Sequence, residues 1–275
     1  MYKFHPSVVY VTDRALSSPL TVKRLDRMLA AVECKDVRRV TDAELNDAVK
    51  ERGWFPGGRT GEARRPDDPD LVLNGFVWRT PQEEAELRKK HPALAPHMLL
   101  GNGCWGFRDG PSYRSSHGGV CQAAWEIHAA FGCLHACQYC HVGNVLNVML
   151  NLEEYVQRLD EFAKTIPWQK LYKYDNQTDT ICLEPEYGAS EVMVSYFATQ
   201  RDKWLMLYTK SDNVDHLLGL KHNGHTIINW TLSCDTTCRE IEKKAPSLAA
   251  RVRAMKLCQD AGYTVRARFS PIVPV

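Results

Sequence analysis

The sequence lacks any long apolar run. No stretch approaches the roughly 20 apolar residues that a membrane-spanning helix needs, and the opening segment MYKFHPSVVYV lacks the charged and then apolar layout of a secretory signal. We therefore expect no membrane contact and a cytoplasmic location. The net charge is also small, at +2. The total charge neither requires nor excludes nucleic acid as a partner, because a local basic patch can hide inside a balanced total.

Cysteine, in contrast, is abundant, with 10 residues in a chain of 275. Disulfides rarely persist in the cytoplasm, so the expected location favours metal ligation or redox chemistry for these thiols. A hydrophobic content of 44% and a charged content of 25% are ordinary for a globular protein of one large or two small domains. No internal repeat of fixed period is visible, which argues against a repeat architecture.

The first 120 residues show little regularity. A β-forming run at residues 8–12 and apolar residues at helical spacing over residues 22–32 predict one strand and one helix. Over residues 54–92, glycine, proline and paired charges predict an exposed, irregular stretch that is interrupted by VLNGFVW and by a polar helix, PQEEAELRKK. We therefore treat residues 1–120 as an N-terminal α/β extension.

From residue 121 the pattern becomes regular, with short β-type runs alternating with amphipathic helices. The predicted strands are WEIHAAF, KLYKYDNQ, WLMLYTK, TIINWTLS and YTVRARFSPIV. The predicted helices between them are NLEEYVQRLDEFAKTI, SEVMVSYFATQ, NVDHLLGLKHNG and SLAARVRAMKLCQDAG. Such alternation predicts βα units and a parallel sheet, so we expect an α/β fold with residues 121–275 as the main unit.

The segment AAFGCLHACQYCHVGN carries the most specific signal in the chain. Cys133, Cys137 and Cys140 form C-x3-C-x2-C directly after a predicted strand, so three thiolates on one tight loop can face a single metal centre. An iron–sulfur cube usually takes four thiolates, and three would leave one iron open for a substrate or cofactor. A structural zinc site needs four protein ligands. Zinc with His135 or His141 as the fourth ligand therefore remains an alternative.

The cysteine spacing, the strand before it, the aromatic Tyr139 and the βα units after it resemble the radical S-adenosylmethionine (SAM) superfamily. Residues 209–226, TKSDNVDHLLGLKHNGHT, and the early stretch VVYVTDRALSSPL resemble the spore photoproduct lyase family. The resemblance implies a partial (β/α)6 TIM-type barrel with a [4Fe–4S] cluster on Cys133, Cys137 and Cys140. It implies SAM as cofactor, DNA or another nucleotide-containing substrate, and a low-potential electron donor such as flavodoxin or ferredoxin. The implied reaction is light-independent reversal of a thymine dimer, begun by a 5′-deoxyadenosyl radical.

The same resemblance implies contacts to SAM near the ends of the parallel strands. The candidate residues are Lys210, Thr231, Ser233 and Glu184. Strand ends are where barrel folds hold their ligands, so the placement is physically sensible. On the residues alone, Lys210 could equally be a solvated strand end, Thr231 and Ser233 could cap the following loop, and Glu184 could lie in a solvated turn.

The residues expected to return a hydrogen atom to the substrate radical, here called the hydrogen relay, depart from the family pattern. The family's repair cycle uses a cysteine near the end of the second strand as hydrogen donor, whereas Gln177 or Thr178 falls at that position here. The nearest thiol is Cys182, which an unbent strand would carry roughly 13–17 Å farther on, at about 3.3 Å per residue. Only a fold-back over residues 179–180 would bring it closer. We therefore expect SAM cleavage with poor or absent clean dimer repair.

Two further residues of the cysteine loop are candidates for the relay. Tyr139 precedes the third cysteine, and His141 stands where the family has a tyrosine implicated in returning the hydrogen. Because this relay is altered, a radical SAM enzyme that modifies another nucleobase or a peptide is an alternative function. A non-catalytic, zinc-stabilised nucleic-acid-binding module is a second alternative.

The predicted barrel is incomplete at its C-terminus. A (β/α)6 barrel needs six strands, and five are predicted before the terminal PIVPV. We therefore expect the outer edge of the fifth strand to be unpaired and prone to association.

Overall fold

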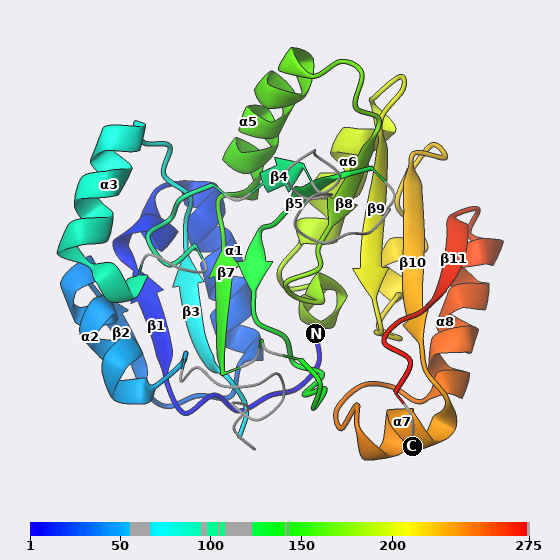
Figure 1. Cartoon of the computed structure of the whole chain (residues 1–275), viewed down its shortest axis with the longest axis horizontal. Helices are drawn as coiled ribbons and strands as arrows, with labels where there is room; N and C mark the ends of the chain where they lie inside the picture. Colours follow the sequence, from blue (N-terminus) through cyan, green and yellow to red (C-terminus); the bar gives the residue numbers. More distant parts are fainter. Residues whose placement is uncertain are drawn as a thin grey trace.

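The strands of the chain form two sheets that lie side by side (Figure 1). The computed structural model describes residues 1–55, 67–94, 98–103, 105–107, 123–140, 142 and 144–273. Within these ranges the first sheet has the order β2-β1-β3-β7-β6, and the second has the order β11-β10-β9-β8-β5-β4. This arrangement confirms the predicted α/β class.

The first sheet is built mainly from the N-terminal part of the chain. Its strands are β1 (Val9–Thr12), β2 (Val37–Val40), β3 (Asp70–Asn74), β6 (Ala130–Phe131) and β7 (Val145–Met149). All pairs are parallel except β6 with β7. The prediction of an exposed, irregular stretch over residues 54–92 is wrong for β3, which is buried along its whole length because β1 and β7 flank it.

Three capped helices accompany this sheet. They are α1 (Pro19–Ala31), α2 (Asp42–Arg52) and α3 (Pro81–Lys90). Each begins with a capping box, in which a Ser or Thr before the helix and the third helical residue satisfy each other's backbone N–H groups. The predicted helices at residues 22–32 and at PQEEAELRKK are confirmed. A short 3-10 turn, Asp13–Leu16, precedes α1, and another, Pro92–Leu94, follows α3.

The second sheet contains the five predicted strands of the main unit. Its members are β4 (Trp105–Phe107), β5 (Trp125–Ile127), β8 (Leu171–Tyr174), β9 (Trp204–Thr209), β10 (Thr226–Leu232) and β11 (Thr264–Phe269). All except β4 run parallel. WEIHAAF is not one strand, since it divides into β5 in this sheet and β6 in the other. The chain therefore crosses between the sheets just before the cysteine motif.

Helices alternate with the strands of the second sheet. They are α5 (Leu152–Thr165), α6 (Ala189–Ala198), α7 (Asp235–Glu240) and α8 (Leu248–Asp260). α6 packs against β9 and β10, and α8 packs against β10 and β11. The predicted helix at NVDHLLGLKHNG is wrong, because only Asp215–Leu217 form a 3-10 turn there. The side chain of Asn213 ties this segment to the carbonyl groups of Ile181 and Glu184 instead.

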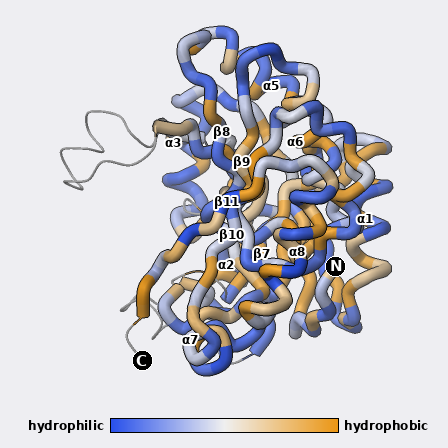
Figure 2. Tube along the Cα trace, turned by 90° about the vertical axis from the view of Figure 1, so that its right-hand side faces the viewer, coloured by the Kyte–Doolittle hydropathy of each residue, from blue (hydrophilic) through white to orange (hydrophobic). Residues whose placement is uncertain are grey.

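The outer edge of β11 has no strand partner within the described residues. A sixth strand does join the sheet, but it is β4, and it pairs with β5 at the opposite edge. β11 is largely exposed, and the colouring of Figure 2 shows hydrophilic stretches along it. Within the described residues the edge is therefore unpaired, whereas its expected tendency to associate stays a prediction. Across the described residues, no helix is both long and apolar enough to span a bilayer.

Candidate metal centre

A cavity of about 200 Å³ opens where the strands of the second sheet end. Its wall is formed by the loop after β6, the segment after β8, and residues at or just beyond the ends of β9, β10 and β11. Carboxyl ends of parallel strands meet at one edge of a sheet, so this cavity lies where such folds hold ligands. Six predicted site residues line it: Cys133, Cys137, Tyr139, Cys140, Lys210 and Thr231.

The backbone of the cysteine loop requires glycine at its start. Gly132 has a φ of 98°, and an added Cβ would lie 2.0 Å from the carbonyl oxygen of Val145. Its N–H donates to the carbonyl oxygen of Gln177 at 3.1 Å, which ties the loop to the segment after β8. Ala136, inside the motif, also lies in the left-handed region with a φ of 53°. Only glycine fits the first position without moving β7.

A second segment, residues 241–244, holds the far side of the loop. The N–H of Gln138 donates to the carbonyl oxygen of Ile241 at 3.0 Å, and the N–H of Lys244 donates to that of His135 at 2.9 Å. Cys137 and Glu242 form an antiparallel bridge between these two N–H contacts. The motif is therefore fixed by backbone contacts from two separate parts of the fold.

The motif thiols have different environments. Burial raises the pKa of Cys137 to about 12, although Lys210 opposes the shift. The pKa of Cys133 is lowered, chiefly because the Cys182 thiol donates a hydrogen bond to its sulfur and because His135 lies nearby. Thiolates are the form that binds metals. Ionised sulfurs in this buried loop need compensating positive charge, which a metal centre supplies.

In the described part of the chain, one group of three or more potential ligands has all its donor atoms within 4.8 Å of one another: Cys133, His135 and Cys182. The three motif cysteines do not form such a compact group, but all three line the same cavity. A cluster that takes one thiolate on each of three irons would be held there by Cys133, Cys137 and Cys140.

Tyr139 belongs to a buried polar network beneath the loop. Its hydroxyl donates to Glu242 Oε1 at 2.5 Å, and Ser233 Oγ donates to the same oxygen at 3.0 Å. The other carboxylate oxygen pairs with Arg251, and both side chains of this pair are fully buried. Glu242 thus fixes the position of the Tyr139 phenol, and it also accepts the hydrogen bond that the Ser233 hydroxyl donates. Ser233 is not among the residues that line the cavity.

Lys210 and Thr231 do face the cavity. The ammonium group of Lys210 lies over the ring of Tyr139, 5.6 Å from its centroid. The Lys210 backbone N–H donates to Asp179 Oδ2 at 2.7 Å, and Thr209 Oγ1 donates to both oxygens of that carboxylate at 2.9 Å. The buried carboxylate of Asp179 therefore fixes the end of β9 and with it the position of Lys210.

Cys182 and Glu184 lie behind the cavity wall. The chain folds back after Asp179 into a 3-10 turn, Thr180–Leu183, so Cys182 is not carried away along an extended strand. Its sulfur is buried 3.4 Å from His135 Nε2. Glu184 accepts hydrogen bonds at 2.7 Å from the backbone N–H groups of Gly188 and Ser190, at the start of α6. Neither residue lines the cavity.

Sequence reasoning missed two carboxylates that organise this site. Asp179 lies just beyond the positions compared with the family's donor cysteine, and its place after a strand was the available signal. Glu242 comes from an irregular segment after α7 and gives no sequence signal. His141 lies outside the described residues.

Comparisons with known proteins point to one family. A family model described as spore photoproduct lyase matches residues 112–274. The spore photoproduct lyase of Bacillus subtilis is 25% identical over 157 residues, covering 54% of this chain and 46% of that protein. The enzyme of Clostridium acetobutylicum is 22% identical over 148 residues, covering 51% and 44%. The chain thus spans about half the length of these relatives.

Solved structures of spore photoproduct lyases share the fold of this chain. A spore photoproduct lyase complexed with dinucleoside spore photoproduct superposes with a TM-score of 0.69 at 20% identity, covering 100% of this chain and 70% of that one. A mutant of such a lyase with bound AdoMet and dinucleoside spore photoproduct gives the same values. The chain is thus an α/β protein that shares the fold of these lyases. The chain belongs to the spore photoproduct lyase family.

Proposed function

We propose that this chain is a radical SAM enzyme of the lyase type, with a [4Fe–4S] cluster on Cys133, Cys137 and Cys140. One observation carries the proposal: the three cysteines share a single cavity wall with Lys210 and Thr231 at the carboxyl ends of the parallel strands. A cluster and SAM, when bound, supply a 5′-deoxyadenosyl radical that takes a hydrogen atom from a substrate. AdoMet bound to a family member of the same fold supports this choice of cofactor.

The chain's own residues would bind and orient SAM. Lys210 offers a cation beside the cysteine loop, and the cation is suited to a carboxylate of the methionine part. Thr231 offers a hydroxyl in the same wall. Tyr139 is held rigid by Glu242, so it would pack against the ligand without losing its own position. Ser233 and Glu184 are already engaged in internal hydrogen bonds. They would therefore act indirectly, by positioning the residues that contact SAM.

We further propose a nucleotide-containing substrate such as DNA. A family member of the same fold binds a dinucleoside spore photoproduct. In this chain, Arg268 lines the cavity, and its guanidinium group lies 5.5 Å from the ring centroid of Tyr208, another lining residue. Guanidinium groups and aromatic rings are common partners of phosphates and bases. The mouth of the cavity therefore offers chemistry suited to a nucleotide.

The hydrogen relay separates this chain from the family's repair cycle. Gln177 and Thr178 line the cavity at the position that corresponds to the donor cysteine, whereas the sulfur of Cys182 lies behind the wall. N–H and O–H bonds are much stronger than S–H bonds, so neither lining residue can replace a thiol donor. We propose SAM cleavage with poor clean dimer repair, and a native substrate that needs no thiol there. Modification of another nucleobase or of a peptide is the second candidate function.

The proposal includes a cytoplasmic location and an external electron source. No disulfide joins the cysteines of the described residues, which suits a reducing compartment. A low-potential donor such as flavodoxin or ferredoxin would deliver the electron.

The test is an anaerobic assay of SAM cleavage with the reconstituted chain, with and without dimer-containing DNA. We expect 5′-deoxyadenosine in both cases and little restored thymine. Thr178→Cys and Gln177→Cys each place a thiol in the cavity wall, and at least one should raise clean repair severalfold. Cys258→Ala, a buried cysteine on α8 outside the cavity, is the control. Absence of SAM cleavage would overturn the proposed activity, and efficient repair by the parent chain would overturn the relay argument.

A further inference from the structure

We propose that Cys133, His135 and Cys182 form a second metal site, which binds one zinc-type divalent ion when the cluster is absent. The site shares only Cys133 with the cysteine motif. It does not rest on the proposed SAM chemistry, because its ligands are defined by their own geometry.

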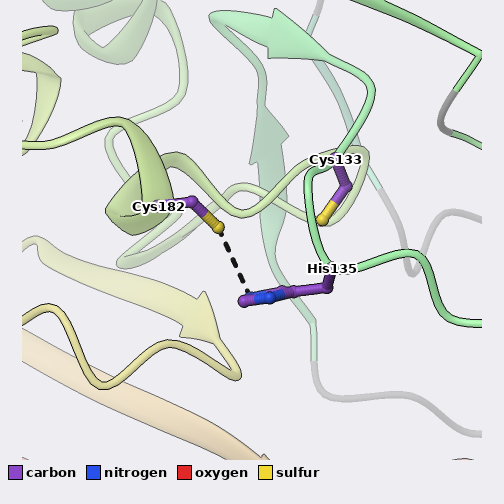
Figure 3. A group of neighbouring side chains, drawn as sticks. All are labelled: Cys133, His135 and Cys182. Carbon is purple, nitrogen blue, oxygen red and sulfur yellow. Dashed lines mark hydrogen bonds between the residues drawn. The ribbon is translucent and has the colours of Figure 1, made fainter. Parts of the chain in front are cut away.

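The three donor groups already converge. Their ligand atoms lie within 4.8 Å of one another, and Cys182 Sγ is 3.4 Å from His135 Nε2 (Figure 3). Zn–S bonds of about 2.3 Å and Zn–N bonds of about 2.0–2.1 Å in a tetrahedron separate ligands by roughly 3.6–3.8 Å. The donors therefore need shifts of no more than about 1 Å to close around an ion.

Two separate parts of the backbone hold these ligands in place. Cys133 and His135 come from the loop after β6, where the His135 carbonyl oxygen accepts from the Lys244 N–H at 2.9 Å. Cys182 lies in the Thr180–Leu183 turn, and its carbonyl oxygen accepts from the Tyr2 N–H at 2.8 Å. The convergence is thus built into the fold rather than produced by mobile side chains.

The two ring nitrogens of His135 have different surroundings. Nε2 faces Cys182 Sγ at 3.4 Å and also lies 2.8 Å from Asp179 Oδ2, so an ion bound at Nε2 would replace the Asp179 contact. Nδ1 is buried without a hydrogen-bond partner in the described part of the chain. A buried nitrogen without a partner is costly, so the imidazole is not fully satisfied by the protein alone.

The donor types select the class of metal. Two thiolates and an imidazole suit Zn²⁺, whereas Mg²⁺ and Ca²⁺ prefer oxygen ligands. Cys133 and His135 also line the cavity, so an ion can reach the site from there. Both sulfurs would bind as thiolates, so any thiol proton still present would be released to water. Since Cys133 cannot serve both centres, zinc and the cluster exclude each other in the same chain.

The experiment uses the full-length chain, freed of iron under reducing, anaerobic conditions, with Co²⁺ as an optical probe for zinc. We expect one Co²⁺ per chain with a thiolate-to-cobalt band, displaced by Zn²⁺. Cys182→Ala and Cys182→Ser should weaken binding more than about 100-fold, because even outer-shell partners of a metal are worth about 10–100-fold. Cys137→Ala and the buried control Cys258→Ala should bind as the parent does. Melting curves establish that each variant is folded.

Two results would overturn the proposal: no cobalt band in the parent chain, or a band that survives in Cys182→Ala and disappears in Cys137→Ala. The second result would assign the ion to the cysteine motif. Iron uptake separates this question from the proposed function, because the cluster requires Cys137 and the zinc site does not. One equivalent of Zn²⁺ should reduce iron uptake severalfold in the parent chain and leave it nearly unchanged in Cys182→Ala.

Discussion

Replacing Gly132 by alanine would disturb the start of the cysteine loop in a calculable way. The φ of 98° costs alanine roughly 1–2 kcal/mol. The added Cβ would also lie 2.0 Å from the Val145 carbonyl oxygen, in β7, which is fixed by its pairing with β3. Forced shifts of a packed backbone add roughly 1–3 kcal/mol. We therefore expect a loss of about 3 kcal/mol in the free energy of unfolding.

Thermal unfolding measures this loss. For a chain of this size, 1 kcal/mol corresponds to roughly 2–4 °C, so Tm should fall by at least about 6 °C. Gly219→Ala is the matched control, because no atom lies within 4 Å of its added Cβ and its φ is outside the left-handed region. The control should change stability by no more than about 0.5 kcal/mol. Equal Tm values for Gly132→Ala and the parent would refute the steric reasoning.

Two further predictions concern buried charges. Arg251→Met should cost about 3–5 kcal/mol in urea unfolding, because it leaves Glu242 buried without its cation. Adding Glu242→Gln should recover part of that loss, and no recovery would contradict the assignment of the cost to an unpaired charge. Burial opposes the charged form of His128, but Asp175, 2.5 Å away, outweighs it and raises the pKa of the imidazole. The contribution of the charged His128–Asp175 pair to the free energy of unfolding should be complete below the ordinary histidine pKa. It should disappear as pH rises through the raised pKa of His128. His128→Asn should remove that pH dependence, and parallel stability curves for parent and variant would speak against it.

The five parallel strands of the second sheet could be predicted because apolar runs alternate with amphipathic helices over the whole main unit. The first sheet could not be. β3 is flanked by proline, glycine and paired charges, and β7 follows the cysteine loop as a short apolar run that pattern alone cannot assign. Both strands are recognisable only through their neighbours in the sheet.

Part of the candidate site was also predictable from the sequence. The motif spacing identified Cys133, Cys137 and Cys140, and the resemblance to the lyase family identified Lys210 and Thr231; all five residues line one cavity. The location of Cys182 was not predictable, because it depends on a turn whose geometry is fixed by tertiary contacts.

Iron content after anaerobic reconstitution tests the central claim most directly. Three thiolate ligands that leave one iron open predict about four irons per chain. Cys133→Ala, Cys137→Ala and Cys140→Ala should each abolish iron binding, whereas Cys258→Ala should retain it. Stoichiometric zinc without iron uptake under reducing conditions, or full iron content in any of the three motif variants, would contradict the account.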